Sequence, residues 1–160
     1  DWGVPVLQGW GMTETSPLCA LSHPPRSFEG ASETQWRAKS GRPVAGMQVR
    51  VVDAEGRPVS HDGATVGELQ LRGPWVTRGY HKENSTDSLS DDGWLRTGDV
   101  GHIDERYFVQ LTDRTKDVIK SGGEWISSVE LENILHSNLM SSAKKVDVFL
   151  ILIFYLMSSF

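Results

Sequence analysis

Residues 111–128 constrain the fold of this chain more than any other stretch. The β-branched pair Val118-Ile119 predicts a short strand. The pair Gly122-Gly123 predicts a turn or a close backbone approach, because glycine tolerates positive φ and has no side chain. Ser127 with Glu130 predicts a capped helix start. The stretch also carries charged side chains at Asp113, Arg114, Lys116, Asp117 and Lys120. We interpret it as a junction where two structured units meet and a ligand binds.

Composition places the chain among ordinary globular proteins. It has 160 residues, a formal charge of -5 and 38% hydrophobic residues, which argues against a nucleic-acid partner because phosphate binding favours a basic face. One cysteine, Cys19, excludes an internal disulfide and a cysteine-based zinc cluster. No signal or transit sequence opens the chain, and it begins at Asp1, so we expect a piece of a longer protein. A cytoplasmic location is favoured, while compartment and oligomeric state stay open.

A glycine-flanked aromatic near the N-terminus is the first candidate site. Residues 4–7 predict a short strand, which leads into residues 9–14, Gly-Trp-Gly-Met-Thr-Glu. The glycines allow close backbone approach to a ligand, and Trp10 offers a flat face. The Thr13 hydroxyl suits a phosphate and the Glu14 carboxylate suits Mg²⁺. The alternative is a polar turn after a strand, because isolated glycine motifs are weak signals.

Short strands separated by glycine and proline are expected in the middle of the chain. Residues 22–39 lack periodicity and predict a surface loop, and residues 80–89 predict a short helix. Residues 47–53, 67–73 and 107–111 predict strands. In the second of these, the expected inward residues are Leu69 and Leu71 and the expected outward residues are Glu68, Gln70 and Arg72. Such close spacing predicts a small β-barrel or sandwich.

Asp99 is the second candidate site residue. It follows Arg96-Thr97-Gly98 at the predicted end of a strand, where a carboxylate can accept hydrogen bonds from a sugar diol. The alternative is that Asp99 only forms a turn. The local pattern leaves both interpretations open.

Three segments and their order along the chain resemble the motifs of the adenylate-forming, or AMP-binding, superfamily. These are residues 9–14, 96–99 and 113–124. Residues 120–128 are most similar to the medium- and long-chain fatty acyl-CoA synthetases. The resemblance implies a mixed α/β fold. Residues 1–115 would be the C-terminal part of the large domain, with a β-barrel-like subdomain, and residues 116–135 the hinge and the start of a small α+β lid domain. Residues 136–160 would be a divergent apolar tail.

The resemblance implies roles around a bound nucleotide. Trp10, between Gly9 and Gly11, would stack against adenine, at a position where many relatives carry tyrosine. Thr13 would contact the α-phosphate, and Glu14 would hold Mg²⁺.

The resemblance also assigns residues later in the chain. Asp99 and Arg114 would bind the ribose hydroxyls, and Lys116 would be the hinge about which the lid rotates. The pantetheine path of CoA would be lined by Lys120, Ser121, Gly122, Gly123, Glu124 and Trp125. For Glu124, a role in thiol activation competes with a plain surface position.

The implied reaction has two steps. A carboxylic acid, expected to be a fatty acid, attacks the α-phosphorus of ATP to give acyl-adenylate and pyrophosphate, and the CoA thiol then displaces AMP. A rotating lid lets one site serve both steps. The alternatives are an adenylation domain that passes its acyl group to a carrier protein, and a truncated, non-catalytic isoform. The family's phosphate loop lies upstream and its catalytic lysine lies past the end of this chain, so we expect the chain alone to lack full activity.

Residues 146–157 are apolar except for Asp147. A run of this length is short of the roughly 20 residues that span a bilayer as a helix, which disfavours a membrane anchor. A retained intron or frameshift is favoured because the resemblance stops abruptly. A buried strand or helix is the other interpretation. Acyl chain specificity cannot be read from these residues.

Overall fold

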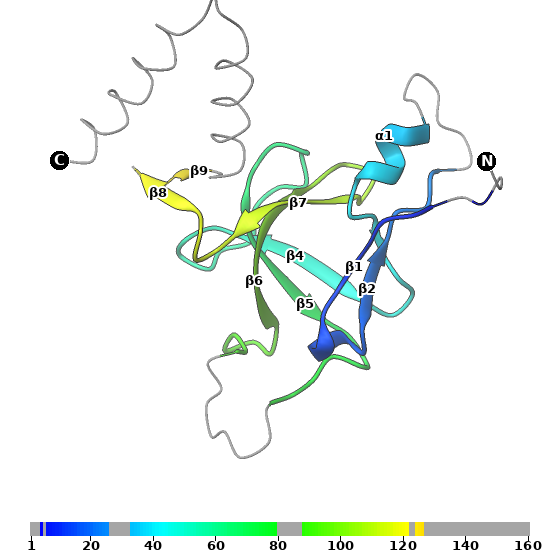
Figure 1. The fold of residues 1–160 in the computed structure, drawn as a ribbon. Helices are drawn as coiled ribbons and strands as arrows, with labels where there is room; N and C mark the ends of the chain where they lie inside the picture. The colour runs from blue at the N-terminus through cyan, green and yellow to red at the C-terminus, as the bar shows by residue number, and fades with distance from the viewer. Residues whose placement is uncertain (1–3, 5, 26–32, 80–87, 122–123, 127–160) are drawn as a thin grey trace, which may run out of the picture. The chain divides into compact units, whose positions relative to one another are not determined.

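The computed structural model describes residues 4, 6–25, 33–79, 88–121 and 124–126 (Figure 1). The described part is rich in strands and contains two short helical segments, the 3₁₀ helix η1 (Thr13–Thr15) and α1 (Glu33–Ala38). The chain divides into two compact units, residues 1–111 and residues 112–160. The strands are β1 (Gly9–Gly11), β2 (Leu18–Leu21), β3 (Arg42–Pro43), β4 (Gln48–Val52), β5 (Gly67–Arg72), β6 (Leu95–Ile103), β7 (Val109–Arg114), β8 (Ile119–Ser121) and β9 (Glu124–Ile126).

Two antiparallel arrangements of strands organise the first unit. A three-stranded sheet has the order β1-β2-β3, and a four-stranded sheet has the order β4-β5-β6-β7. The pair β4–β5 is antiparallel and runs from Gln48 opposite Arg72 to Val52 opposite Glu68. A bridge between Gly41 and Val109 links the two sheets, with the Val109 N–H donating to the Gly41 carbonyl at 2.8 Å. The expected β-rich, mixed architecture is therefore confirmed.

The two sheets share one hydrophobic core. Val49 and Val51 of β4 and Leu69 and Leu71 of β5 are at most 2% exposed, as period-2 alternation predicts for a strand with one face on the core. Residues of β1 and β2 complete the same cluster. These are Trp10, Cys19 and Ala20. The core thus brings the first candidate site segment into contact with the four-stranded sheet.

Several expected strands are confirmed with small shifts of their ends. The strands predicted over residues 47–53 and 67–73 are β4 and β5, and the strand predicted over 107–111 is β7, which begins two residues later. The strand predicted over residues 4–7 is wrong in position, because β1 begins at Gly9, where pairing with Leu21 of β2 begins.

Three further expectations are corrected by tertiary contacts. The predicted loop over residues 22–39 contains α1, a helix too short for clear periodicity, which is anchored by the buried ring of Trp36. Gln70, expected to point outward, is 3% exposed, and its amide oxygen accepts a hydrogen bond from Arg50 Nε at 2.9 Å. Asp99, expected at the end of a strand, lies in the middle of β6.

The second unit contains the predicted charged joint. Residues 115–117 form a turn, closed by hydrogen bonds from the backbone N–H groups of Asp117 and Val118 to the Arg114 carbonyl at 2.9 and 3.0 Å. β8 and β9 then pair antiparallel, with Lys120 opposite Trp125. The predicted domain boundary at residues 115–116 stays a prediction.

Some expectations fall outside the described residues. These are residues 80–87 of the helix predicted over residues 80–89, the Gly122-Gly123 pair, the capped helix from Ser127 and the tail of residues 136–160. Among the helices that the structure describes, none is both long and apolar enough to cross a membrane.

Candidate functional site

The segment from β1 through η1 to β2 is a tight loop closed by its own backbone. The Met12 N–H donates to the Pro17 carbonyl at 2.8 Å. Thr15 is fully buried, and its hydroxyl accepts from the Met12 N–H at 3.0 Å and donates to the Pro17 carbonyl at 2.6 Å. A Cβ on Gly11 would lie 1.8 Å from the Pro17 carbonyl oxygen, so only glycine fits there. Sequence reasoning missed Thr15, because its role depends on this loop geometry.

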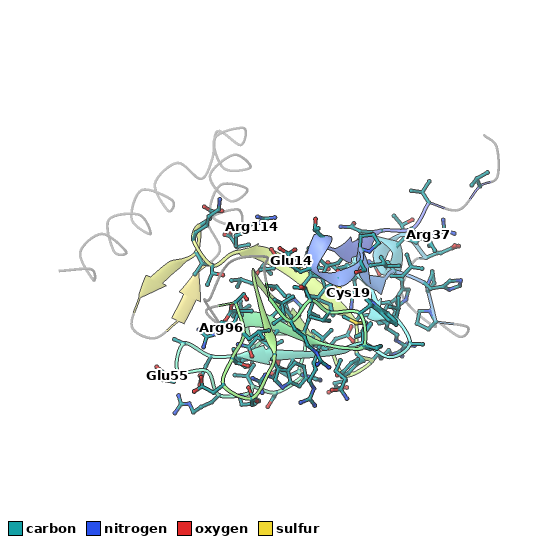
Figure 2. The ribbon with its side chains drawn as sticks, turned by 90° about the horizontal axis from the view of Figure 1, so that it is seen from below. Glu14, Cys19, Arg37, Glu55, Arg96 and Arg114 are labelled. Carbon is teal, nitrogen blue, oxygen red and sulfur yellow. The ribbon has the colours of Figure 1, made fainter. Side chains whose placement is uncertain are left out.

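This loop presents the predicted phosphate and metal residues on η1. Thr13 is exposed and Glu14 is half-buried, and Figure 2 labels Glu14 beside the N-terminal strands. The Glu14 carbonyl accepts a hydrogen bond from the Thr77 N–H at 2.9 Å, which ties η1 to the loop after β5. That loop borders a pocket of about 200 Å³, which sequence reasoning also missed. It is lined by Arg72, Gly73, Val76, Thr77, Arg78, Leu89 and Gly93.

Trp10 and Asp99, which are 89 positions apart in the sequence, meet directly. The indole Nε1–H of Trp10 donates a hydrogen bond to Asp99 Oδ2 at 2.8 Å. Trp10 is 4% exposed and Asp99 is 9% exposed. Because a hydrogen bond between a neutral donor and a buried carboxylate is charge-assisted, it fixes the orientation of the carboxylate strongly. The structure therefore joins two of the residues predicted to bind the nucleotide.

An irregularity in β6 places Asp99 beside Trp10. Glu68 and Gln70 of β5 are two residues apart, whereas their partners in β6, Val100 and Arg96, are four residues apart. The additional residues of β6 form a bulge at Gly98, which has φ +71°. Bulges re-aim side chains and are common next to binding sites.

Two hydrogen bonds fix the backbone at this bulge. The Asp99 N–H donates to Thr97 Oγ1 at 3.0 Å, and the Thr97 hydroxyl donates to the Leu69 carbonyl at 2.7 Å. Thr97 therefore ties the backbone of Asp99 to β5. In the sequence, the hydroxyl of Thr97 two residues before Asp99 is the feature that could have indicated this role.

Cys19 of β2 is a buried neighbour of Trp10. Its side chain, labelled in Figure 2, is fully buried. Its thiol donates to the Trp10 carbonyl at 3.1 Å. Burial, together with the negative charge of Asp99, raises the pKa of Cys19 from the ordinary value of 9.0 to about 12. The thiol therefore stays protonated at neutral pH and is inert in the folded protein.

The raised pKa predicts how stability depends on pH. Above pH 9 the unfolded chain releases the Cys19 proton while the folded chain keeps it until about pH 12. The free energy of unfolding therefore falls as pH rises through this window, by about 1.4 kcal/mol per pH unit. Cys19→Ser, which does not ionise there, should remove this part of the slope in urea unfolding at pH 8 to 11. Equal slopes for both proteins would contradict the prediction.

The remaining predicted residues belong to the second unit. Arg114, at the end of β7, and Lys116, in the turn that follows, are both exposed. The β8–β9 pairing sets Lys120 opposite Trp125 and Ser121 opposite Glu124. Four of the six residues predicted to line the CoA path are thus neighbours in one hairpin.

Mg²⁺ would have one protein carboxylate on η1, that of Glu14. Among the residues that the structure describes, no group of three or more His, Cys, Asp or Glu side chains could form a metal cluster of its own. One carboxylate together with substrate phosphates is nevertheless an ordinary environment for Mg²⁺. The residues present therefore fit a metal that arrives with a nucleotide.

Comparison with known proteins adds independent information. Residues 1–81 match the family described as AMP-binding enzyme. The sequence is 49% identical over 138 residues to a long-chain-fatty-acid–CoA ligase of Thermus thermophilus, covering 83% of this chain and 26% of that protein. It is 42% identical over 147 residues to a medium-chain-fatty-acid–CoA ligase of Ectopseudomonas oleovorans, covering 89% of this chain and 27% of that protein. The chain thus spans about a quarter of the length of the curated relatives it matches.

Solved structures give the same picture of the fold. An unliganded O-succinylbenzoate coenzyme A synthetase of Bacillus subtilis superposes with a TM-score of 0.67 at 30% identity, over 84% of this chain and 28% of that one. ATP-bound MatB of Rhodopseudomonas palustris gives a TM-score of 0.65 at 30% identity, over 82% and 25% of the two chains.

Proposed function

Because this chain belongs to the AMP-binding enzyme family, we propose that it forms part of an ATP-dependent acyl-CoA synthetase. The enzyme would convert a carboxylic acid and ATP to an acyl-adenylate and then to an acyl-CoA. Relatives named as long- and medium-chain-fatty-acid–CoA ligases support a fatty acid as substrate and CoA, rather than a carrier protein, as acyl acceptor. The observation that carries the proposal is the hydrogen bond between Trp10 and Asp99, two residues that the sequence predicts to bind the nucleotide.

The residues of the first unit would bind the nucleotide. The Asp99 carboxylate, held by the indole N–H, accepts hydrogen bonds from the ribose diol. The exposed Thr13 hydroxyl donates to the α-phosphate, and the neighbouring Glu14 carboxylate holds Mg²⁺. When bound, Mg²⁺ neutralises the phosphate charge that develops as the carboxylic acid attacks.

The second unit would serve the thioester step. Lys116 sits in an exposed turn, which suits a hinge, because only a few backbone torsions need to change for a lid to rotate. Arg114, immediately before this turn, would reach the ribose. The β8–β9 hairpin would line the pantetheine arm of CoA.

The test is isotope exchange between pyrophosphate and ATP by the complete protein that carries this chain. Exchange that depends on an added fatty acid, followed by acyl-CoA formation on addition of CoA, is the expected result. Glu14→Gln should raise the Mg²⁺ concentration for half-maximal exchange about tenfold, because a ligating charge is lost. Glu55→Gln is the matched control, since Glu55 is an exposed carboxylate that forms an ion pair with the exposed Arg57. Exchange without any acid, or no exchange with any acid, would refute the proposal.

A further inference from the structure

Thr15 is the buried member of η1, the single 3₁₀ turn that also carries Thr13 and Glu14. It is fully buried, whereas Thr13 is exposed and Glu14 is half-buried. A 3₁₀ helix has three residues per turn, so three successive side chains point about 120° apart. The direction in which Thr15 enters the protein therefore sets the directions of Thr13 and Glu14.

Hydrogen bonds hold the Thr15 side chain in that direction. Its hydroxyl accepts from the Met12 N–H at 3.0 Å and donates to the Pro17 carbonyl at 2.6 Å. The Met12 N–H also donates to the same carbonyl at 2.8 Å. The hydroxyl thus joins the residue before η1 to the residue that leads into β2, and it restrains rotation of the turn about its own axis.

The backbone that follows η1 adopts a conformation that costs energy. Ser16 has φ +52° and ψ +51°, in the left-handed region that residues other than glycine rarely occupy. Such a conformation persists only where the surrounding contacts over-determine it, and residues of this kind cluster at ligand sites. The hydroxyl of Thr15, the preceding residue, supplies two of these contacts.

A second anchor reaches η1 from the loop after β5. The Thr77 N–H donates to the Glu14 carbonyl at 2.9 Å, and the Ser16 hydroxyl donates to the Trp75 carbonyl at 3.4 Å. These two bonds hold the position of the turn on the four-stranded sheet. The buried hydroxyl of Thr15 holds its rotation.

We propose that Thr15 is a positioning residue, whose buried hydroxyl orients the Thr13 hydroxyl and the Glu14 carboxylate toward the α-phosphate of the nucleotide and its Mg²⁺. This inference rests on the proposed function, in which Thr13 and Glu14 make those contacts. It gives Thr15 an effect on the phosphate and the metal, and none on the nucleoside. Loss of the hydroxyl should weaken ligands that carry a phosphate and spare those that lack it.

The test compares Thr15→Val with Thr15→Ser in the complete protein that carries this chain. Valine keeps the branched shape of threonine without the hydroxyl, and serine keeps the hydroxyl. Calorimetry measures binding of AMP and of adenosine, which has the same base and ribose but no phosphate. For Thr15→Val we expect about fivefold weaker binding of AMP and a change of less than about twofold for adenosine. Thr15→Ser should bind AMP within about twofold of the wild type.

Isotope exchange between pyrophosphate and ATP gives a second measurement. Thr15→Val should raise the Mg²⁺ concentration for half-maximal exchange about fivefold, because a carboxylate turned away from the metal holds it less well. Phe108→Leu is the control for a general loss of stability, since Phe108 is a buried core residue that packs against Trp36 of α1. It should leave AMP binding and the Mg²⁺ concentration unchanged.

The other outcomes overturn the inference. Unchanged AMP binding in Thr15→Val means that the hydroxyl does not orient the turn. Equal weakening of AMP and adenosine, or an equal effect of Phe108→Leu, means that the substitution disturbs the whole site. An equal loss in Thr15→Ser means that the hydroxyl is not responsible. If Glu14→Gln leaves the Mg²⁺ dependence unchanged, the metal site of the proposed function fails, and this inference fails with it. A shift for Glu14→Gln without one for Thr15→Val overturns the role of Thr15 alone.

Discussion

Replacement of Asp99 by alanine is expected to weaken AMP binding about 100-fold. The variant removes the proposed acceptor of two ribose hydroxyls, and hydrogen bonds to a charged group contribute about 1.5 kcal/mol or more each, or about 3 kcal/mol together. Calorimetric titration of the complete protein with AMP measures the effect.

The same substitution should also reduce stability. It leaves the buried Trp10 N–H without its acceptor, which costs about 1–3 kcal/mol. Asp91→Ala is the matched control, because Asp91 is an exposed carboxylate in the turn before β6. A loss of affinity below fivefold for Asp99→Ala, or an equal loss for Asp91→Ala, would contradict the ribose assignment.

Replacement of Phe108 by alanine is expected to destabilise the 160-residue chain by about 3–5 kcal/mol, a large share of the roughly 5–15 kcal/mol that stabilises a typical domain. Phe108 is fully buried and is the largest of the fully buried side chains among the described residues. Its ring centroid lies 4.8 Å from that of Trp36, and the Arg42 guanidinium covers it at 4.7 Å. Removal of the ring therefore leaves a cavity beneath α1.

Urea unfolding followed by circular dichroism measures this loss. Phe108→Leu is the control, since it keeps most of the apolar volume and should lose less than about 2 kcal/mol. Trp36→Ala in the Phe108→Ala background should add less than it does in the wild-type chain, because the two rings share one contact. Additive losses would indicate that the rings stabilise the chain independently.

Much of the β structure could be predicted from local pattern. Alternation of apolar and polar residues marked β4 and β5, and it also identified Leu69 and Leu71 as inward residues. The pattern failed at Gln70, because burial of a polar side chain depends on a partner, here Arg50, from the neighbouring strand. The local pattern also failed to predict α1, because a helix of six residues has too few turns to show periodicity. In addition, Trp36 of α1 packs against Phe108, which lies far along the chain.

The candidate site, like the fold, was determined in part by the sequence and in part by the tertiary structure. The order and spacing of the motifs in the sequence determined the family and singled out Trp10, Glu14 and Asp99 individually. Only the tertiary structure decided that the indole N–H of Trp10 meets Asp99, and that a bulge in β6 brings the carboxylate there. The physical reason is that residue types and turn chemistry act over a few neighbouring positions. A contact between residues 89 positions apart depends on how two sheets pack and on a strand register that no local pattern encodes.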